Sequence, residues 1–202
     1  DASLEAIPHV DRAAYFDAMN AVIARLHGVD HAAIGLGDYG RPGNYFERQI
    51  ARWSDQYRND PSAGRDENMD RLVAWLPGHI PDDDAVAIVH GDMRIDNLVF
   101  HPEAPIVIGV LDWELSTLGH PLADFAYQAM MYRMPPHIVA GLGGSDPGAL
   151  GLPSEADYVA AYCKRVGRPA IADYDFYTAF NLFRLAAIFL GINGRVIRGN
   201  AS

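Results

Sequence analysis

The chain has 202 residues, half of them hydrophobic, and its 26 acidic and 16 basic side chains give a formal net charge of −10. This apolar content is sufficient for one hydrophobic core and argues against an intrinsically disordered chain. The negative charge argues against nucleic acid and an anionic membrane surface as partners, because both attract clustered Lys and Arg. The single cysteine, Cys163, excludes an internal disulfide framework and a cysteine-rich zinc site, and it fits the reducing cytoplasm, where we expect the protein to be.

The N-terminal third of the chain is predicted to form helices that serve packing. Apolar side chains recur at helical spacing over residues 11–27, 44–57 and 67–76. Asp11 is expected to cap the first of these helices, and Gly28 follows its last residue. Because aromatic stripes on helices usually face a core, we expect the aromatic side chains of all three helices to be buried.

The middle of the chain is predicted to be rich in strands. Short apolar runs over residues 85–89, 97–100 and 106–111 have the length of strands, and residues 101–105 fit a hairpin connection between the last two. Polar residues gather at the ends of these runs. Since loops at strand ends often carry function, we expect the chemistry of the protein to lie here.

Helices are predicted again in the C-terminal part, over residues 121–132, 154–166 and 173–192. Ser154, followed by Asp157, is expected to cap the second of these helices. The segment 134–153 is rich in Gly and Pro and is too long for a simple connection, so we expect it to be functional or mobile. The most apolar stretch, 182–193, is shorter than the ~20 residues of a membrane-spanning helix, and we expect no membrane span. No internal repeat is visible, and we expect a single domain over residues 1–202.

One segment of the chain combines residues that suit phosphoryl transfer. The sequence VHGDMRIDNL at 89–98 has the spacing H-x-D-x-x-x-x-N of the protein-kinase catalytic loop. In that reaction a carboxylate orients the acceptor hydroxyl and takes its proton, a role that fits Asp92. A neutral amide binds Mg²⁺ without adding charge, which fits Asn97. Arg94 is placed to stabilise the transferred phosphoryl group electrostatically.

A second magnesium ligand is expected at the end of a neighbouring strand. Asp112 closes the apolar run 106–111 and is followed by Trp113 and Glu114. Taken alone, each Asp or Asn here could be an ordinary turn or cap residue, because both types bond readily to nearby backbone. The combination of strand, motif, hairpin, strand and aspartate is far more specific. His90 is expected to brace the loop rather than to act as an acid or base.

Two other chemistries have little support in the sequence. Four histidines are separated by 11, 11 and 19 residues, which fits neither the helical pair of a zinc protease nor a zinc finger: His79, His90, His101 and His120. Ser116 and Ser154 lack the G-x-S-x-G setting of a hydrolase nucleophile. We therefore expect neither a zinc site nor a serine hydrolase.

These residues resemble the aminoglycoside phosphotransferase and choline-kinase-like family, whose fold is similar to that of protein kinases. The matching residues are VHGD at 89–92 with Asn97, VLDWE at 110–114 and GHPLAD at 119–124. A closer resemblance, over 90–102 and 111–117, is to the phosphotransferase-like domain that accompanies some acyl-CoA dehydrogenases. The likeness covers the whole chain and is strongest over its middle third.

The resemblance implies an α+β fold of protein-kinase type, mostly helical with a small β-rich catalytic segment. It implies ATP and Mg²⁺ as cofactors, Asp92 as catalytic base, and Asn97 and Asp112 as metal ligands. Arg94 matches the place where protein kinases carry a phosphate-contacting lysine. Val99 matches the apolar floor beneath the adenine of the nucleotide.

Two further residues gain a role only from the resemblance. Asp124 is implied to brace the catalytic loop rather than to react, and Glu114 is open to a contact with substrate or metal. The chain departs from the family pattern at its start. Its one lysine, Lys164, follows the catalytic segment, and the glycine-rich residues 35–40 have neither a preceding strand nor a following lysine. We therefore expect a C-terminal lobe alone, inactive by itself, with the N-terminal lobe in a further ~100 upstream residues of the native protein.

The sequence thus predicts an ATP- and Mg²⁺-dependent phosphotransferase that acts on a hydroxyl group of a small molecule. The alternative is a pseudokinase-like binding or scaffolding module, which the missing lobe favours and the intact Asp92, Asn97 and Asp112 oppose. The acceptor is left open, because the negative charge favours an aminoglycoside-like cation, whereas the closer resemblance favours an anionic hydroxyacyl-CoA. The segment 134–153 and the helices after it are expected to form the acceptor site.

Overall fold

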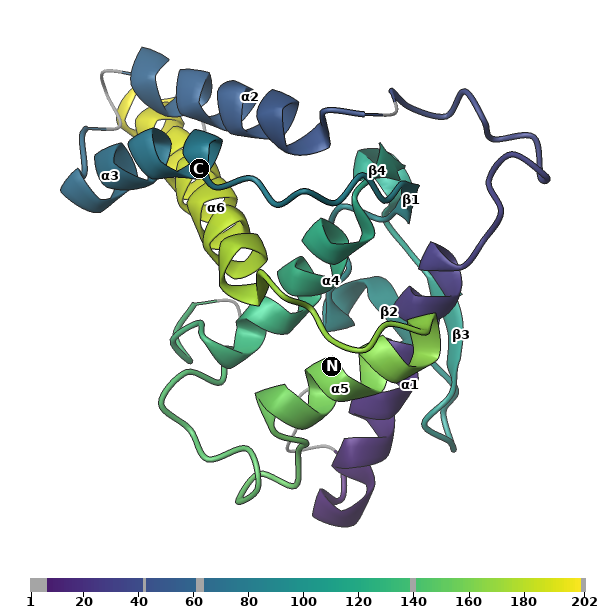
Figure 1. Ribbon diagram of the computed structural model, residues 1–202. Coiled ribbons are helices and arrows are strands. Elements are labelled where there is room, and N and C mark those ends of the chain that lie inside the picture. Colours follow the sequence, from purple (N-terminus) through teal and green to yellow (C-terminus); the bar gives the residue numbers. More distant parts are fainter. Residues whose placement is uncertain (1–6, 42, 61–63, 139–140, 201–202) are drawn as a thin grey trace. The chain divides into compact units, whose positions relative to one another are not determined.

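The computed structural model describes residues 7–41, 43–60, 64–138 and 141–200 (Figure 1). Their contacts divide the chain into two compact units. The first unit takes its described residues from Asp1–Arg41 and Ala85–Ala172, and the second from Pro42–Asp84 and Asp173–Ser202. The chain therefore passes between the units three times, after residues 41, 84 and 172. The expectation of a single domain stays a prediction.

The first unit combines helices with two small antiparallel sheets. Its helices are α1 (Arg12–His27), α4 (Pro121–Ala129) and α5 (Glu155–Val166), and its strands are β1 (Ala87–Val89), β2 (Leu98–Phe100), β3 (Val107–Val110) and β4 (Thr117–Gly119). Single 3₁₀ turns connect them: η2 (His9–Asp11), η4 (Ile95–Asn97), η5 (Trp113–Leu115) and η6 (Met130–Tyr132). The predicted helices and the three predicted strands are all present here, with shorter strands than expected.

One of the two sheets joins strands that are neighbours in the sequence, and the other joins strands that are farther apart. Strands β2 and β3 form the predicted hairpin, with Val99 opposite Gly109. Strand β1 pairs with β4, and Ile88 lies opposite Leu118. Strand β4 was not predicted, because Leu118 is its one large apolar side chain and the strand therefore forms no apolar run in the sequence. Its antiparallel pairing with β1 places the residues that follow β1 next to the residues that precede β4, and the catalytic motif begins there.

Aromatic side chains fill the core of the first unit. Helix α1 packs along α5, and Phe16 and Ile23 of α1 are buried. Phe125 of α4 stacks on Tyr162 of α5 with ring centroids 3.9 Å apart. Burial of each such side chain stabilises the fold by about 1.5–3 kcal/mol. The predicted burial of the first helix's apolar face is confirmed for these residues.

The ends of two helices test the predicted caps. Ser154 caps α5 as expected, since its hydroxyl accepts a hydrogen bond from the Asp157 amide at 3.1 Å. The predicted cap of α1 by Asp11 is wrong, because the Asp11 side chain makes no capping bond. The 3₁₀ turn η2 runs directly into α1, so Asp11 already has helical backbone angles and its side chain is not directed at the first free amides.

The second unit is a group of helices, α2 (Tyr45–Asn59), α3 (Glu67–Trp75), the 3₁₀ turn η3 (Leu76–Gly78) and α6 (Tyr174–Ile197). Helix α2 packs along α6, where the ring of Phe46 contacts Phe176 and Phe180. Two hydrogen bonds from Arg198 to Asp60 hold the last turn of α6 against the end of α2. Of the stripe predicted for α2, Ile50, Trp53 and Tyr57 are buried as expected, and Tyr45 is only partly buried. The predicted burial of the aromatic side chain in α3 is wrong, because Trp75 is 39% exposed and stacks on the ring of His79 at the end of the helix.

Helix α6 is longer than the predicted 173–192 and extends to Ile197. With 24 residues it is long and apolar enough to cross a membrane, by length and composition alone. The expectation that no stretch reaches that length is wrong, because the apolar character continues on both sides of the stretch 182–193. A core helix passes the same test, and α6 buries Phe176, Phe180 and Phe183 within the second unit.

The Ser154 cap leads to a stability prediction. Replacement of Ser154 by Ala removes the acceptor for the Asp157 amide, and we expect the free energy of unfolding to fall by about 1 kcal/mol. Urea unfolding followed by circular dichroism measures this change. Ser145→Ala, at an exposed serine that caps no helix, is the control and should leave the midpoint unchanged. Equal effects of the two substitutions would contradict the cap.

Candidate active site

The loop that follows β1 carries the catalytic motif, and its path depends on Gly91. This residue has φ +86°, in the left-handed region that favours glycine. A Cβ atom at this position would lie 2.7 Å from the carbonyl oxygen of Leu115. The two segments lie this close because β1 and β4 are paired. The loop therefore turns sharply against η5, and the fully buried side chain of Met93 anchors it on the core.

The carboxylate of Asp92 is held from two sides. Its Oδ1 accepts a hydrogen bond from the Tyr127 hydroxyl at 2.5 Å, and its Oδ2 accepts one from Asn97 Nδ2 at 3.1 Å. The side chain of Asp92 is 20% exposed. Because each carboxylate oxygen has two lone pairs, Oδ2 can still accept a proton or a further hydrogen bond from outside. The carboxylate of Asp92 is thus held in one orientation and is accessible to a molecule from solvent.

The amide of Asn97 is oriented by the same loop. Its Nδ2 donates to the backbone carbonyl of Asp92 at 2.8 Å as well as to the carboxylate. A carbonyl oxygen can only accept, so the NH₂ group must face it and Oδ1 must point elsewhere. Within the part of the chain that the structure describes, Oδ1 receives no hydrogen bond. Asn97 therefore offers one amide oxygen, the ligand type that Mg²⁺ prefers.

Arg94 lies between two carboxylates. Its Nε is 3.2 Å from Asp92 Oδ1, and Nη1 is 3.6 Å from Asp96 Oδ2. The side chain of Arg94 is about one-third exposed. The guanidinium thus places a positive charge directly beside Asp92, and its expected contact with a phosphoryl group stays a prediction.

Asp112 lies next to the strand end that pairs with Asn97. The amide of Leu111 donates to the carbonyl of Asn97 at 2.8 Å, and Asp112 is the next residue. Its φ is +63°, a left-handed conformation that aspartate adopts more readily than most side chains. Among the residues described, none forms a hydrogen bond or ion pair with its exposed carboxylate. Val99 lies two residues after Asn97, on β2, and is 37% exposed.

The site residues thus form one cluster around the ends of β1, β2 and β3. Direct contacts join Asp92, Arg94 and Asn97, whereas Asp112 is linked to Asn97 through the backbone of Leu111. No group of three or more His, Cys, Asp or Glu with metal-binding geometry occurs in the described ranges. An amide oxygen and one carboxylate still suit Mg²⁺, which commonly takes few protein ligands and completes its shell with phosphates and water.

The buried His90 ring joins the two halves of this cluster. Its Nδ1 accepts from the amide of Asp92 at 3.2 Å, so Nε2 carries the proton and donates to the carbonyl of Leu111 at 2.8 Å. The ring also packs against Trp113, with centroids 4.9 Å apart. His90 therefore ties the catalytic loop to the strand end before Asp112, which is the bracing role expected for it.

Asp124, in the first turn of α4, holds the backbone of the catalytic loop in place. Its two carboxylate oxygens accept hydrogen bonds from the amides of His90 and Gly91, both at 2.8 Å. Burial alone would raise the pKa of this carboxyl, but the hydrogen bond and charge of His27 and the two amides outweigh it and hold the pKa below its ordinary value. Asp124 is therefore ionised and braces the loop, as the resemblance implied.

Tyr127 is a site residue that the sequence analysis missed. Its hydroxyl contacts Asp92 across 35 positions of the chain, and no local motif includes it. One signal was available, because Tyr127 follows Asp124 by three residues on a helix, and such residues share a face. A helix whose Asp124 faces the catalytic loop therefore presents Tyr127 to the same loop.

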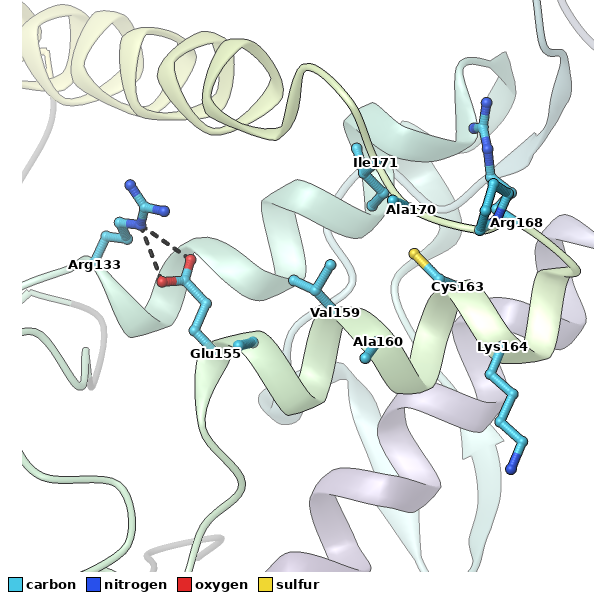
Figure 2. A pocket seen from close by; sticks show the side chains of 11 residues that line it. Arg133, Glu155, Val159, Ala160, Cys163, Lys164, Arg168, Ala170 and Ile171 are labelled. Atoms are coloured by element: carbon cyan, nitrogen blue, oxygen red, sulfur yellow. Dashed lines mark hydrogen bonds and ion pairs between the residues drawn. The ribbon is translucent and has the colours of Figure 1, made fainter.

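A separate pocket of about 520 Å³ lies along α5 (Figure 2). Figure 2 shows the ion pair of Arg133 and Glu155 at one end and the Cys163 side chain near Ile171. Burial raises the pKa of the Cys163 thiol, and the nearby Arg168 opposes this shift. None of the described residues that line the pocket belongs to the catalytic loop or to 134–153. The expected role of that segment in acceptor binding stays a prediction.

The buried Asp124 leads to a prediction on pH. In Asp124→Asn an amide NH₂ faces a backbone N–H, and we expect the free energy of unfolding at pH 7 to fall by about 3–5 kcal/mol. Because the pKa of Asp124 is lowered by folding, its stabilisation is complete above the unfolded-state value of about 3.9 and is lost as the pH falls through the lower folded value.

Urea unfolding at a series of pH values measures this difference. The gap between wild type and Asp124→Asn should be constant near neutrality and should narrow only in acid. Asp82→Asn, at an exposed position, is the control and should show little change at any pH. A gap that widens in acid would contradict a lowered pKa for Asp124.

Comparison with known proteins relates the chain to one enzyme family. Residues 2–177 match the model of the phosphotransferase enzyme family. Acyl-CoA dehydrogenase family member 10 of Mus musculus is 43% identical over 204 residues, which cover 100% of this chain and 19% of the relative. Family member 11 of Gallus gallus is 40% identical and covers 100% of this chain and 26% of the relative. The chain thus spans about a fifth to a quarter of the length of these curated relatives.

Solved structures show the same fold. A Ralstonia eutropha protein, provisionally assigned as an aminoglycoside phosphotransferase, has a TM-score of 0.91 and 52% identity, over 96% of this chain and 60% of that one. An aminoglycoside phosphotransferase of Streptomyces rimosus, in complex with ADP and streptomycin, has a TM-score of 0.59 and 16% identity, over 90% and 68%. The predicted kinase-like fold, helical with small sheets, is confirmed. By its match over most of its length, the chain belongs to the phosphotransferase enzyme family.

Proposed function

We propose that this chain is the catalytic lobe of an ATP- and Mg²⁺-dependent phosphotransferase that phosphorylates a hydroxyl group of a small molecule. The observation that carries the proposal is the oriented pair of Asp92 and Asn97, with Asp112 one residue beyond the strand end that pairs with Asn97. Among the described residues, neither the exposed Asp112 carboxylate nor Asn97 Oδ1 has a hydrogen-bond partner, which leaves both able to bind a ligand. Family membership supports the same reaction class.

Asp92 is the base in this proposal. Tyr127 and Asn97 fix the plane of its carboxylate, and Oδ2 receives the acceptor hydroxyl. The carboxylate orients the oxygen for attack and accepts its proton as the bond to phosphorus forms. Arg94 stands beside the same carboxylate and stabilises negative charge on the transferred group.

The remaining site residues serve the nucleotide. Asn97 Oδ1 and the Asp112 carboxylate would hold Mg²⁺, which neutralises charge on the terminal phosphates when bound. The half-exposed Val99 offers an apolar surface for the adenine ring. The complex of a related fold with ADP supports nucleotide use. Since the chain covers 60% of the Ralstonia chain, we further propose that an N-terminal lobe in a longer protein completes the site.

Two observations bear on the chemical class of the acceptor, and each favours a different class. A phosphotransferase of the same fold binds streptomycin. The curated relatives with 43% and 40% sequence identity to this chain carry the name acyl-CoA dehydrogenase. We favour the second, because the structure that holds streptomycin is only 16% identical to this chain, and the Ralstonia protein at 52% identity carries only a provisional assignment. A hydroxyacyl-CoA is therefore the first acceptor to test, with an aminoglycoside as the comparison.

The second candidate function is a pseudokinase-like binding module. It is favoured by the names of the long relatives, which describe a different activity from phosphotransfer. In this role the chain would bind the substrate of an attached enzyme without phosphorylating it. Absence of Mg²⁺-dependent nucleotide binding in the full-length protein would favour this module over the phosphotransferase.

The role of Asp92 leads to a prediction on turnover. In the full-length protein, Asp92→Asn should lower kcat by about 10²–10⁴-fold, because an amide cannot accept the proton of the hydroxyl. Coupled ADP release with a panel of hydroxyacyl-CoA and aminoglycoside acceptors measures kcat. Asp82→Asn serves as the exposed control and should keep wild-type turnover. Full activity of Asp92→Asn with unchanged folding would refute the proposed base.

The proposed metal ligands lead to a separate prediction. Asp112→Asn keeps the shape of the side chain but removes its charge, so the Mg²⁺ concentration for half-maximal activity should rise by about tenfold or more. A magnesium titration at saturating nucleotide measures this shift. Glu103→Gln, on the exposed hairpin, is the control. An unchanged magnesium requirement would remove Asp112 from the site.

A further inference from the structure

A buried histidine lies behind the catalytic loop, and the proposed reaction does not use it. His27 is the last residue of α1, and its side chain is only 2% exposed. Its Nε2 is 3.2 Å from Asp124 Oδ2, and its Nδ1 is 2.7 Å from the hydroxyl of Tyr162 on α5. Both ring nitrogens therefore have partners, on two different helices. Figure 1 shows α1, α4 and α5, the three helices that these contacts connect.

The chemistry of Asp124 fixes the direction of its hydrogen bond with His27. Asp124 is ionised and can only accept, so His27 Nε2 must carry a hydrogen and donate it. Nδ1 shares a hydrogen bond with the Tyr162 hydroxyl, as acceptor in the neutral ring and as donor in the charged ring. In both forms of the ring, Nε2 donates to Asp124, and the Tyr162 hydroxyl holds the ring from its other side. Packing holds Tyr162 as well, because its ring stacks on Phe125 of α4.

The chain of contacts continues into the catalytic loop. Asp124 Oδ2, which receives His27, also accepts the amide of His90, and Oδ1 accepts the amide of Gly91. His90 Nδ1 in turn accepts the amide of Asp92. The position of Asp92 thus depends on where the Asp124 carboxylate points. That carboxylate could rotate about its own side-chain bonds, and His27 is the side chain that donates to it. The loop cannot compensate easily, because Gly91 is tightly packed against Leu115.

We propose that His27 is a positioning residue, which holds the Asp124 carboxylate so that the catalytic loop presents Asp92 to the acceptor hydroxyl. The catalytic part of this inference rests on the proposed function, whereas the structural part does not. The contribution of His27 comes from one atom, the donor Nε2. A side chain that replaces this donor should therefore preserve the loop, and one that does not should release it.

Two substitutions of His27 separate these cases. The amide nitrogen of Gln can take the place of Nε2, whereas the shorter Asn reaches only to the position of Nδ1. In the full-length protein we expect His27→Asn to lower kcat by about 10- to 100-fold with little change in the KM for nucleotide, since a small displacement of a reacting group has this effect. His27→Gln should stay within a few-fold of wild type.

Amide hydrogen exchange provides a readout that needs no catalysis. In peptides that cover residues 87–98, His27→Asn should speed the exchange of the His90 and Gly91 amides, and His27→Gln should not. Tyr132→Phe is the control, because it removes a different hydrogen bond inside the first unit. That bond joins the hydroxyl of the buried Tyr132 to the carbonyl of Pro153. The control should leave exchange in 87–98 and kcat unchanged.

The outcomes decide between the possibilities. If His27→Asn leaves exchange in 87–98 unchanged, or if His27→Gln and His27→Asn behave alike, His27 has no positioning role. If His27→Asn does not fold, Tyr162→Phe takes its place against Tyr132→Phe. Because the Tyr162 hydroxyl holds the imidazole with Nε2 towards Asp124, its removal should raise exchange at His90 and Gly91 by a smaller amount, and no rise would refute the positioning role. If the wild-type protein phosphorylates no acceptor, the proposed function fails, and the exchange comparison still decides the role of His27.

Discussion

The buried carboxylate of Asp124 is the interaction on which the site depends. A charge without solvent is costly unless hydrogen bonds surround it, and here two loop amides and His27 do so. Those same hydrogen bonds determine the path of the loop. Because His90 and Gly91 are bonded through their backbone, their contribution is independent of side-chain identity. The cost of burying Asp124 is thus offset by groups that at the same time orient Asp92.

The two strand ends of the site are joined by a single residue, Leu111. Its carbonyl accepts from His90 and its amide donates to Asn97, so the backbone before Asp112 is bonded to both sides of the catalytic motif. Base and proposed metal ligands are therefore connected through backbone groups rather than through flexible side chains. Such a connection preserves their spacing, which a reaction between a hydroxyl and a metal-bound phosphate requires.

The sequence predicted the parts of the site that depend on local spacing. Asp92 and Asn97 lie five residues apart in one loop, so their contact could be anticipated from the motif alone. Tyr127 could not, because its contact with Asp92 exists only once α4 has packed beneath the loop. The same reason applies to β4, whose pairing with β1 is tertiary, and to Asp11, whose capping role was displaced by a 3₁₀ turn that leaves no pattern in the sequence.

The three passages of the chain between the units have a consequence for cleavage. Each unit is assembled from two separate stretches of sequence, and the passage after residue 84 lies only a few residues before β1. One proteolytic cut at any passage leaves the two units joined covalently at the other two. Neither unit can therefore be released as an intact fragment by a single cut, and a truncation at residue 84 or 172 leaves at least one unit without one of its two stretches of sequence.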